Sequence, residues 1–235
     1  MKILILDNAI DRDIYSPISH WKKFLTLPSD AFWASKGELP ESIDEYTHVI
    51  ITGSEATITE EADWVQREEI LIRKAVADGL VILGSCYGHQ LLAKALFGSD
   101  SVGKSETPEL GWDYLNVIKD DSLFGDAGAM LPVLLIHFDE VRSVPEDHVD
   151  IIASTKNCRI HIFKLKGKPV WGIQAHPEID IDEGRATIER MIKKAEDENS
   201  PRLKFFLKAR GSTPKEAGWF ETFMKKFQSV GDQLS

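Results

Sequence analysis

Cysteine is scarce in this sequence, and long apolar runs are absent. Only Cys86 and Cys158 occur among 235 residues, and neither belongs to a Cys-x-x-Cys pair. Such a chain is not a disulfide scaffold, and we expect a reducing, cytoplasmic compartment in which a reactive thiol persists. No run approaches the ~20 apolar residues of a membrane span. The apolar run 3–6 ends at Asp7, which is too short for the core of a secretion signal.

An excess of basic charge is also missing. The chain carries 28 lysines and arginines against 38 aspartates and glutamates, a formal charge of −10. This balance argues against non-specific binding to nucleic acid or to an anionic membrane. No Gly-x-x-x-x-Gly-Lys-Ser/Thr phosphate loop occurs, so no nucleotide-binding synthase domain is expected in this chain. With 43% hydrophobic residues at this length, one substantial core is the default expectation.

Strand-like and helix-like runs alternate in the first hundred residues, which predicts a parallel sheet with helices on both faces. Later runs predict further strands that add an antiparallel portion, and the chain closes with helices. We therefore expect an α/β domain over residues 1–194 and a helical extension over 195–235 packed on it, with a polar linker at 195–201. Strands are expected at 2–6, 31–34, 48–52, 80–84, 112–119, 133–137, 150–154, 159–165 and 169–174, and helices at 21–27, 60–77, 88–97, 181–194, 202–209 and 214–228.

The most informative motif is Gly84-Ser85-Cys86-Tyr87-Gly88, which separates a β-branched apolar run from a helix-like segment. This Gly-x-Cys-x-Gly pattern is the cysteine form of a nucleophile elbow, in which glycines remove Cβ atoms that would clash in a tight strand-to-helix turn. A thiol with an ordinary pKa of ~8.5 needs a base or a positive field to become a nucleophile at neutral pH. The start of the following helix supplies part of that field.

The expected base is His176 in the segment Gln174-Ala175-His176-Pro177-Glu178, at the end of an apolar strand. Pro177 favours an extended backbone at His176, which would place the side chains of His176 and Glu178 on one side. The carboxylate could then hold one imidazole nitrogen and leave the other for the thiol. Taken singly, Cys86 could be a small buried hydrophobe and His176 an ordinary histidine before a proline. Their occurrence together favours a catalytic pair.

The two segments Gly84–Gln90 and Gln174–Glu178 together resemble the class I (triad) glutamine amidotransferase domains, here a stand-alone member similar to GMP synthetase. The resemblance extends from about Met1 to about Ile192. It implies a flavodoxin-like fold, an open and mostly parallel sheet with the cysteine at the elbow. It also implies release of ammonia from glutamine through a γ-glutamyl thioester, with Cys86 as nucleophile, His176 as base and then acid, and Glu178 as the orienting carboxylate.

The same resemblance implies roles for neighbouring residues. Backbone N–H groups of Tyr87 and of the loop containing Gly53 and Ser54 would form the oxyanion hole. This loop is shorter than the family's common Gly-Gly-Pro-Gly-Ser, which leaves open which N–H points inward. The substrate would contact Gln90, His137, Phe138 and Asp139. The segment Glu109–Trp112 also fits the family, with a structural role expected.

Two versions of the activity stay open: ammonia passes to a separate synthase, or the chain itself cleaves γ-glutamyl compounds as γ-glutamyl peptidase-like relatives do. Other Cys-His hydrolases fit less well, because α/β-hydrolases place the acid before the histidine and papain-like enzymes carry an additional cysteine before the nucleophile. A non-catalytic subunit on the same fold is a third possibility. No cofactor and no metal site are expected, because the remaining histidines show no ligand spacing with cysteines or carboxylates: His20, His48, His89, His148 and His161.

Overall fold

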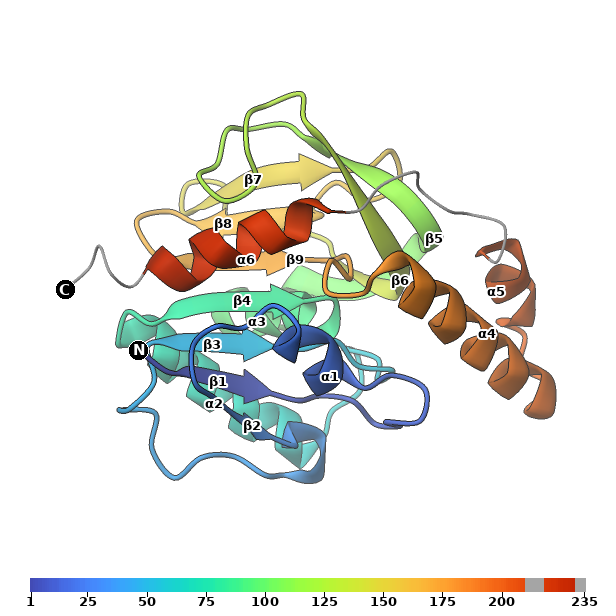
Figure 1. Ribbon diagram of the computed structural model, residues 1–235, viewed down its shortest axis with the longest axis horizontal. Helices are drawn as coiled ribbons and strands as arrows, with labels where there is room; N and C mark the ends of the chain where they lie inside the picture. The colour runs from blue at the N-terminus through green and yellow to red at the C-terminus, as the bar shows by residue number, and fades with distance from the viewer. Residues whose placement is uncertain (210–217, 231–235) are drawn as a thin grey trace.

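The computed structural model describes residues 1–209 and 218–230, and its centre is one mixed sheet of nine strands (Figure 1). The strand order is β2-β1-β3-β4-β9-β8-β7-β5-β6. The strands are β1 (Ile3–Leu6), β2 (Ser29–Phe32), β3 (His48–Ile51), β4 (Val81–Ser85), β5 (Val102–Val117), β6 (Met130–Val141), β7 (Val149–Ser154), β8 (Ile162–Leu165) and β9 (Val170–Ile173). The α-helices are α1 (Pro17–Lys22), α2 (Asp63–Ala77), α3 (Tyr87–Phe97), α4 (Ile181–Asp197), α5 (Leu203–Ala209) and α6 (Trp219–Ser229).

The first half of the sheet is parallel, as expected from the alternation of strands and helices. Strands β2, β1, β3, β4 and β9 pair in parallel, and β1, β3, β4 and β9 are buried along their whole length. Because side chains alternate across a strand, Leu4 and Leu6 enter one core while Ile3 and Ile5 enter another on the opposite face. The expected α/β sheet with an antiparallel addition is confirmed.

Helices cover both faces of this sheet (Figure 1). Helices α2 and α3 pack on the face that contains Leu4 and Leu6, and α1 and α6 contribute Trp21 and Phe220 to the opposite core. The first helix begins four residues earlier than expected, since Pro17 occupies its first turn, where a missing N–H costs nothing.

The antiparallel portion consists of β8, β7, β5 and β6, and it is longer than the sequence indicated. Strand β5 begins at Val102, ten residues before the expected start, and pairs along β6 with a register shift between Lys104 and Glu109. The segment between these residues is polar and contains Pro108, so it lacks the hydrophobic alternation that identifies a strand. Pairing with β6 on both sides of this segment, rather than local propensity, makes 102–117 one strand.

The helix expected at 181–194 is longer than predicted: α4 continues to Asp197, three residues into the stretch that was expected to be a polar linker. Ala195 is 4% exposed and packs with Ile188 and Ile192, so burial of one helix face overrides the polar composition of the supposed linker. Of the last expected helix, residues 214–217 lie outside the described part of the chain. Among residues 1–209 and 218–230, no helix is both long enough and apolar enough to cross a membrane.

Candidate functional site

The elbow between β4 and α3 has the sharp geometry that its glycines predicted. Cys86 adopts φ 51° and ψ −107°, a backbone conformation that non-glycine residues rarely adopt. A Cβ atom on Gly84 would lie 2.4 Å from the carbonyl oxygen of Gly88, and one on Gly88 would lie 2.1 Å from that of Ile51. Close backbone approach on both sides therefore excludes any side chain at these two positions. Cys86 is 4% exposed and lines a cavity.

Sheet topology brings His176 to this elbow from 90 residues away. Strands β4 and β9 are direct neighbours, with Ser85 paired to Ile173, and the N–H of Cys86 donates to the carbonyl of Ile173 at 2.8 Å. Cys86 follows β4 and His176 follows β9, so both lie at the carboxyl edge of the parallel strands, the usual location of a site in such sheets. The N–H of His176 also donates to the carbonyl of Leu134 on β6 at 2.9 Å.

His176 and Glu178 are in contact, although the backbone between them differs from the expectation. Nδ1 of His176 lies 2.9 Å from Oε1 of Glu178. The chain is not extended here: it turns after His176, and the N–H of Ile179 returns to the carbonyl of His176 at 3.4 Å. A turn, rather than the expected extended backbone, thus brings the side chains of His176 and Glu178 together. This is possible because Pro177 fixes only its own φ and does not restrict the backbone dihedrals of the residue after it.

The electrostatics of the three groups favour an ion pair. Burial alone would lower the pKa of His176, but the charge of Cys86 and the carboxylate of Glu178 hold it well above its usual value. Burial would likewise raise the pKa of Glu178, and His176 together with other donors keeps it below its usual value. The arrangement thus favours an imidazolium at His176 beside Cys86, and a neighbouring positive charge is what activates a cysteine nucleophile.

Two residues that the sequence analysis did not single out complete the environment of Glu178. The hydroxyl of Tyr15 donates to Oε1 of Glu178 at 2.7 Å, and the hydroxyl of Ser85 lies 3.2 Å from Oε2. The Tyr15 ring also meets His176 edge-on, with centroids 5.4 Å apart. Ser85 could have been found from its place directly before Cys86. No motif marks Tyr15, which lies in the loop after β1.

The expected oxyanion loop lies against the histidine. A Cβ atom on Gly53 would come within 2.7 Å of Cε1 of His176, so only glycine fits without movement of the ring. Ser54 and Tyr87 line the same cavity as Cys86. Tyr87 opens α3, where the first backbone N–H groups have no partner within the helix. These positions are compatible with the expected roles of the three residues.

The cavity in front of Cys86 measures about 190 Å³, far more than the ~10–15 Å³ that one water needs. It extends from the elbow to α4 and α5, which lie beyond the carboxyl ends of β1, β3 and β4 (Figure 1). All four expected substrate-binding residues line it: Gln90, His137, Phe138 and Asp139. Its far wall contains residues that the sequence analysis did not assign: Met191, Lys194, Glu198, Arg202 and Phe206.

Hydrogen bonds already engage part of this expected substrate-binding set. Nε2 of Gln90 donates to the carbonyl oxygen of Asp139 at 2.8 Å, and it lies 3.2 Å from Oε1 of Gln174. The Asp139 carboxylate accepts from the hydroxyl of Thr57 and from the N–H of Ile58 at 3.1 Å. Asp139 therefore fixes the loop that follows Ser54. Nε2 of Gln174 lies 3.9 Å from Sγ of Cys86, so this residue of the second motif also contacts the thiol, a role that the sequence did not reveal.

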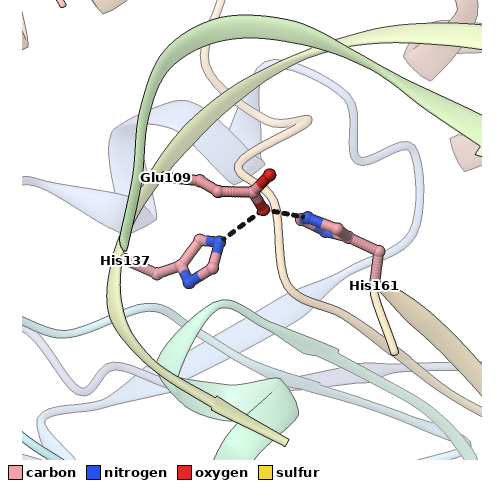
Figure 2. Close-up of side chains that lie close together, drawn as sticks. All are labelled: Glu109, His137 and His161. Atoms are coloured by element: carbon pink, nitrogen blue, oxygen red, sulfur yellow. Dashed lines mark hydrogen bonds and ion pairs between the residues drawn. The ribbon is translucent and has the colours of Figure 1, made fainter. Parts of the chain in front are cut away.

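The ring of His137 is paired with Glu109 on β5. Its Nε2 lies 3.2 Å from Oε2 of Glu109, and Nε2 of His161 lies 2.7 Å from the same oxygen (Figure 2). This is the group of side chains in the described chain whose atoms could hold a metal ion. Chain spacing did not reveal it, because its members come from three separate segments.

A family model, that of the class-I glutamine amidotransferases, matches residues 23–194, nearly three quarters of the chain. The chain belongs to this family. The matched residues include the elbow and the segment with His176 and Glu178, as the resemblance implied, while Tyr15 precedes them.

Two kinds of protein are represented among relatives of similar sequence. A glutamine-hydrolyzing GMP synthase component from Methanobrevibacter smithii is 40% identical over 98 residues, which are 42% of this chain and 50% of that protein. Gamma-glutamyl peptidase 4 of Arabidopsis thaliana is 28% identical over 170 residues, 69% of this chain and 66% of that protein. The chain thus spans about half the length of the GMP synthase components that it matches.

Solved structures agree on the fold. A glutamine amidotransferase from Thermotoga maritima superposes with a TM-score of 0.71 at 22% identity, covering 97% of both chains. A glutamine amidotransferase from Methylobacillus flagellatus gives 0.73 at 19% identity, covering 97% of this chain and 94% of that one. At these identities the likeness establishes the shared α/β fold.

Proposed function

We propose that this chain hydrolyses the side-chain amide of glutamine through a γ-glutamyl thioester on Cys86, releasing ammonia and glutamate. The observation that carries the proposal is the strained elbow at Cys86 beside the hydrogen-bonded pair His176–Glu178, all three within the residues that match the family. The GMP synthase relatives are named as glutamine-hydrolyzing, which supports the same reaction.

In the first half of the reaction, the Cys86 thiolate attacks the amide carbon of the glutamine side chain and forms a C–S bond. The carbonyl electrons move to oxygen, where N–H groups of Tyr87 and of the Gly53-Ser54 loop would stabilise the charge, an effect of roughly 3–4 kcal/mol per donor in comparable sites. When the C–N bond breaks, the His176 imidazolium gives its proton to the leaving amine, which departs as ammonia.

In the second half, water attacks the thioester carbon while the now neutral His176 takes its proton. The C–S bond breaks, glutamate leaves, and Cys86 returns as a thiolate beside the imidazolium. Glu178 holds Nδ1 of His176 throughout, so that the other ring nitrogen faces the reacting atoms.

A second candidate, hydrolysis of γ-glutamyl compounds larger than glutamine, is favoured by the cavity lining, which includes residues of α4 and α5 as well as of the elbow. The part of this lining that comes from α4, α5 and the turn between them includes Lys194, Arg202 and Phe206. An amide leaving group needs none of these residues, whereas the remainder of a γ-glutamyl peptide could contact them. The relative named gamma-glutamyl peptidase 4 supports this version. In the first version, ammonia passes to a separate synthase in a reducing, cytoplasmic compartment.

The two versions separate in one experiment. The purified chain is incubated with glutamine and, in parallel, with γ-glutamyl dipeptides, and ammonia, glutamate and the released amino acid are quantified. Turnover of glutamine alone supports the first version, and preference for dipeptides supports the second. If neither is cleaved, with or without a separate synthase, the chain is a non-catalytic member of the family.

A glutamine-analogue electrophile tests the nucleophile independently of turnover. We expect one added mass, located at Cys86 by peptide mapping. Cys158 serves as the internal control, because it is 2% exposed and burial raises the pKa of its thiol. Labelling at Cys158 in place of Cys86 contradicts the assignment.

A further inference from the structure

Behind the pocket wall, three buried side chains from separate parts of the fold converge on one point. Glu109 lies on β5, His137 on β6 and His161 directly before β8, and they are 6%, 3% and 0% exposed (Figure 2). Their potential ligand atoms all lie within 4.8 Å of one another. None of these three side chains transfers a proton in the reaction proposed at Cys86.

A neutral imidazole alone cannot make both of the hydrogen-bond contacts of His137. Nδ1 lies 3.1 Å from the carbonyl oxygen of Asp139, and Nε2 lies 3.2 Å from the Glu109 carboxylate. Both partners are acceptors, whereas a neutral imidazole has a single N–H. One nitrogen lone pair therefore faces an oxygen lone pair unless a cation, either a second proton or a metal ion, lies between the ring and the carboxylate.

His161 adds a second buried imidazole to the same carboxylate, so two ring nitrogens and a carboxylate oxygen converge on the point where a cation would lie. Its Nε2 lies 2.7 Å from the same Glu109 oxygen, and its buried Nδ1 has no hydrogen-bond partner. With the proton on Nε2, the Nδ1 lone pair is buried and unpaired. With the proton on Nδ1, that N–H is a buried donor without a partner, and the Nε2 lone pair points at the carboxylate, in the direction of a shared cation.

The surroundings match those of a metal ligand set. Ligating histidines usually donate their second N–H to a backbone carbonyl, as Nδ1 of His137 would to Asp139. The other oxygen of Glu109 accepts from the hydroxyl of Thr155 at 2.7 Å, which fixes the carboxylate. Hydrogen-bond contacts thus hold the Glu109 carboxylate at both of its oxygens.

We infer that Glu109, His137 and His161 form a binding site for a divalent transition-metal ion, with zinc the best match to two imidazoles and one carboxylate. In a tetrahedral site with bonds of ~2.0–2.1 Å, neighbouring ligand atoms lie about 3.3 Å apart. The Glu109–His137 pair already has this spacing, and His161 needs to retreat by about half an ångström to reach the same separation. His137 also lines the cavity, so the cluster lies directly behind the cavity wall.

The site is distinct from the reaction at Cys86, and binding can be measured without turnover. Because a thiolate beside His176 also offers zinc ligands, the full-length chain with Cys86→Ser is the parent for the test. Zinc ion is titrated calorimetrically, and we expect one ion per chain. In C86S/H161Q, where glutamine can keep a hydrogen bond to Glu109, we expect binding at least about tenfold weaker. In C86S/H148Q, which alters an exposed histidine outside the cluster, binding should be unchanged.

A second measurement decides the case even if the cluster variant does not fold. In the ¹⁵N-histidine-labelled parent, zinc should shift the Nε2 resonances of two rings and leave both Nδ1 atoms protonated. Absence of stoichiometric binding, equal binding by C86S/H161Q, or shifts confined to other histidines would overturn the proposal and leave a protonated His137 as the explanation. Failure of glutamine hydrolysis would not bear on it.

Discussion

Removal of one hydroxyl from the environment of Glu178 tests the triad most sharply. Tyr15→Phe deletes a buried donor that lies 2.7 Å from Oε1, the same oxygen that holds His176. A hydrogen bond to a charged group contributes roughly 1.5–3 kcal/mol. If the loss falls on the transition state, kcat decreases about ten- to a hundredfold, since each ~1.36 kcal/mol is a factor of ten. KM should change little, because Tyr15 acts through Glu178 rather than on the substrate amide.

The pH profile adds a readout that loss of folding cannot imitate. The Tyr15 hydrogen bond is one of the contacts that lower the pKa of Glu178, after those of His176. Without it the pKa of Glu178 rises, so the carboxylate becomes protonated at a higher pH. The acidic limb of the kcat/KM profile therefore shifts to higher pH. Steady-state hydrolysis of the better substrate is measured across pH, with thermal melting to confirm folding. Tyr114→Phe, at an exposed position on β5, is the matched control. An unchanged kcat together with an unchanged acidic limb refutes a positioning role for Tyr15.

Three further perturbations have defined outcomes. Glu178→Gln should reduce kcat less than His176→Ala does, because it removes only the group that orients the ring; equal losses would show a larger role for the carboxylate. Gly88→Ala should destabilise the chain by about 1–3 kcal/mol or more in urea denaturation, since its Cβ would meet a backbone oxygen at 2.1 Å, whereas Gly218→Ala, with open space around it, should not. Glu68→Gln should stabilise the chain increasingly with pH. Burial raises the pKa of Glu68 to about 8 from 4.5, so the folded chain binds the extra proton between these values and loses stability as the pH rises, by up to roughly 5 kcal/mol. The urea midpoints of the variant and the parent should therefore be similar at pH 5 and differ at pH 8.5, and a pH-independent difference contradicts the reasoning.

The sequence was sufficient to predict those parts of the candidate site that depend on local backbone geometry. The elbow needs glycine at Gly84 and Gly88 because backbone oxygens approach within 2.4 Å of their virtual Cβ positions, and this constraint is written into five consecutive residues. The segment of His176 and Glu178 is equally local. The parallel half of the sheet was also predictable, since its short buried strands end at turn residues.

Residues that act across the sheet could not be predicted in the same way. Tyr15 and Glu178 are 163 positions apart, and only the neighbouring positions of β1, β3, β4 and β9 bring the loop after β1 to the end of β9. The extended first part of β5 and the continuation of α4 past Lys194 have the same cause. Polar segments adopt strand or helix structure there because tertiary pairing and burial outweigh their local conformational propensity.

The contrast between Glu178 and Glu109 explains why one carboxylate was recognised and the other was assigned only a structural place. Each accepts from an imidazole and a hydroxyl inside the protein. Glu178 lies two residues from its histidine, so the pair is visible as a motif, whereas Glu109 lies 28 and 52 residues from His137 and His161. The two sites also meet physically, since the carbonyl of Asp139 accepts from His137 on one side and from Gln90 on the other. The proposed metal site and the proposed substrate pocket therefore share a single peptide group, that of Asp139.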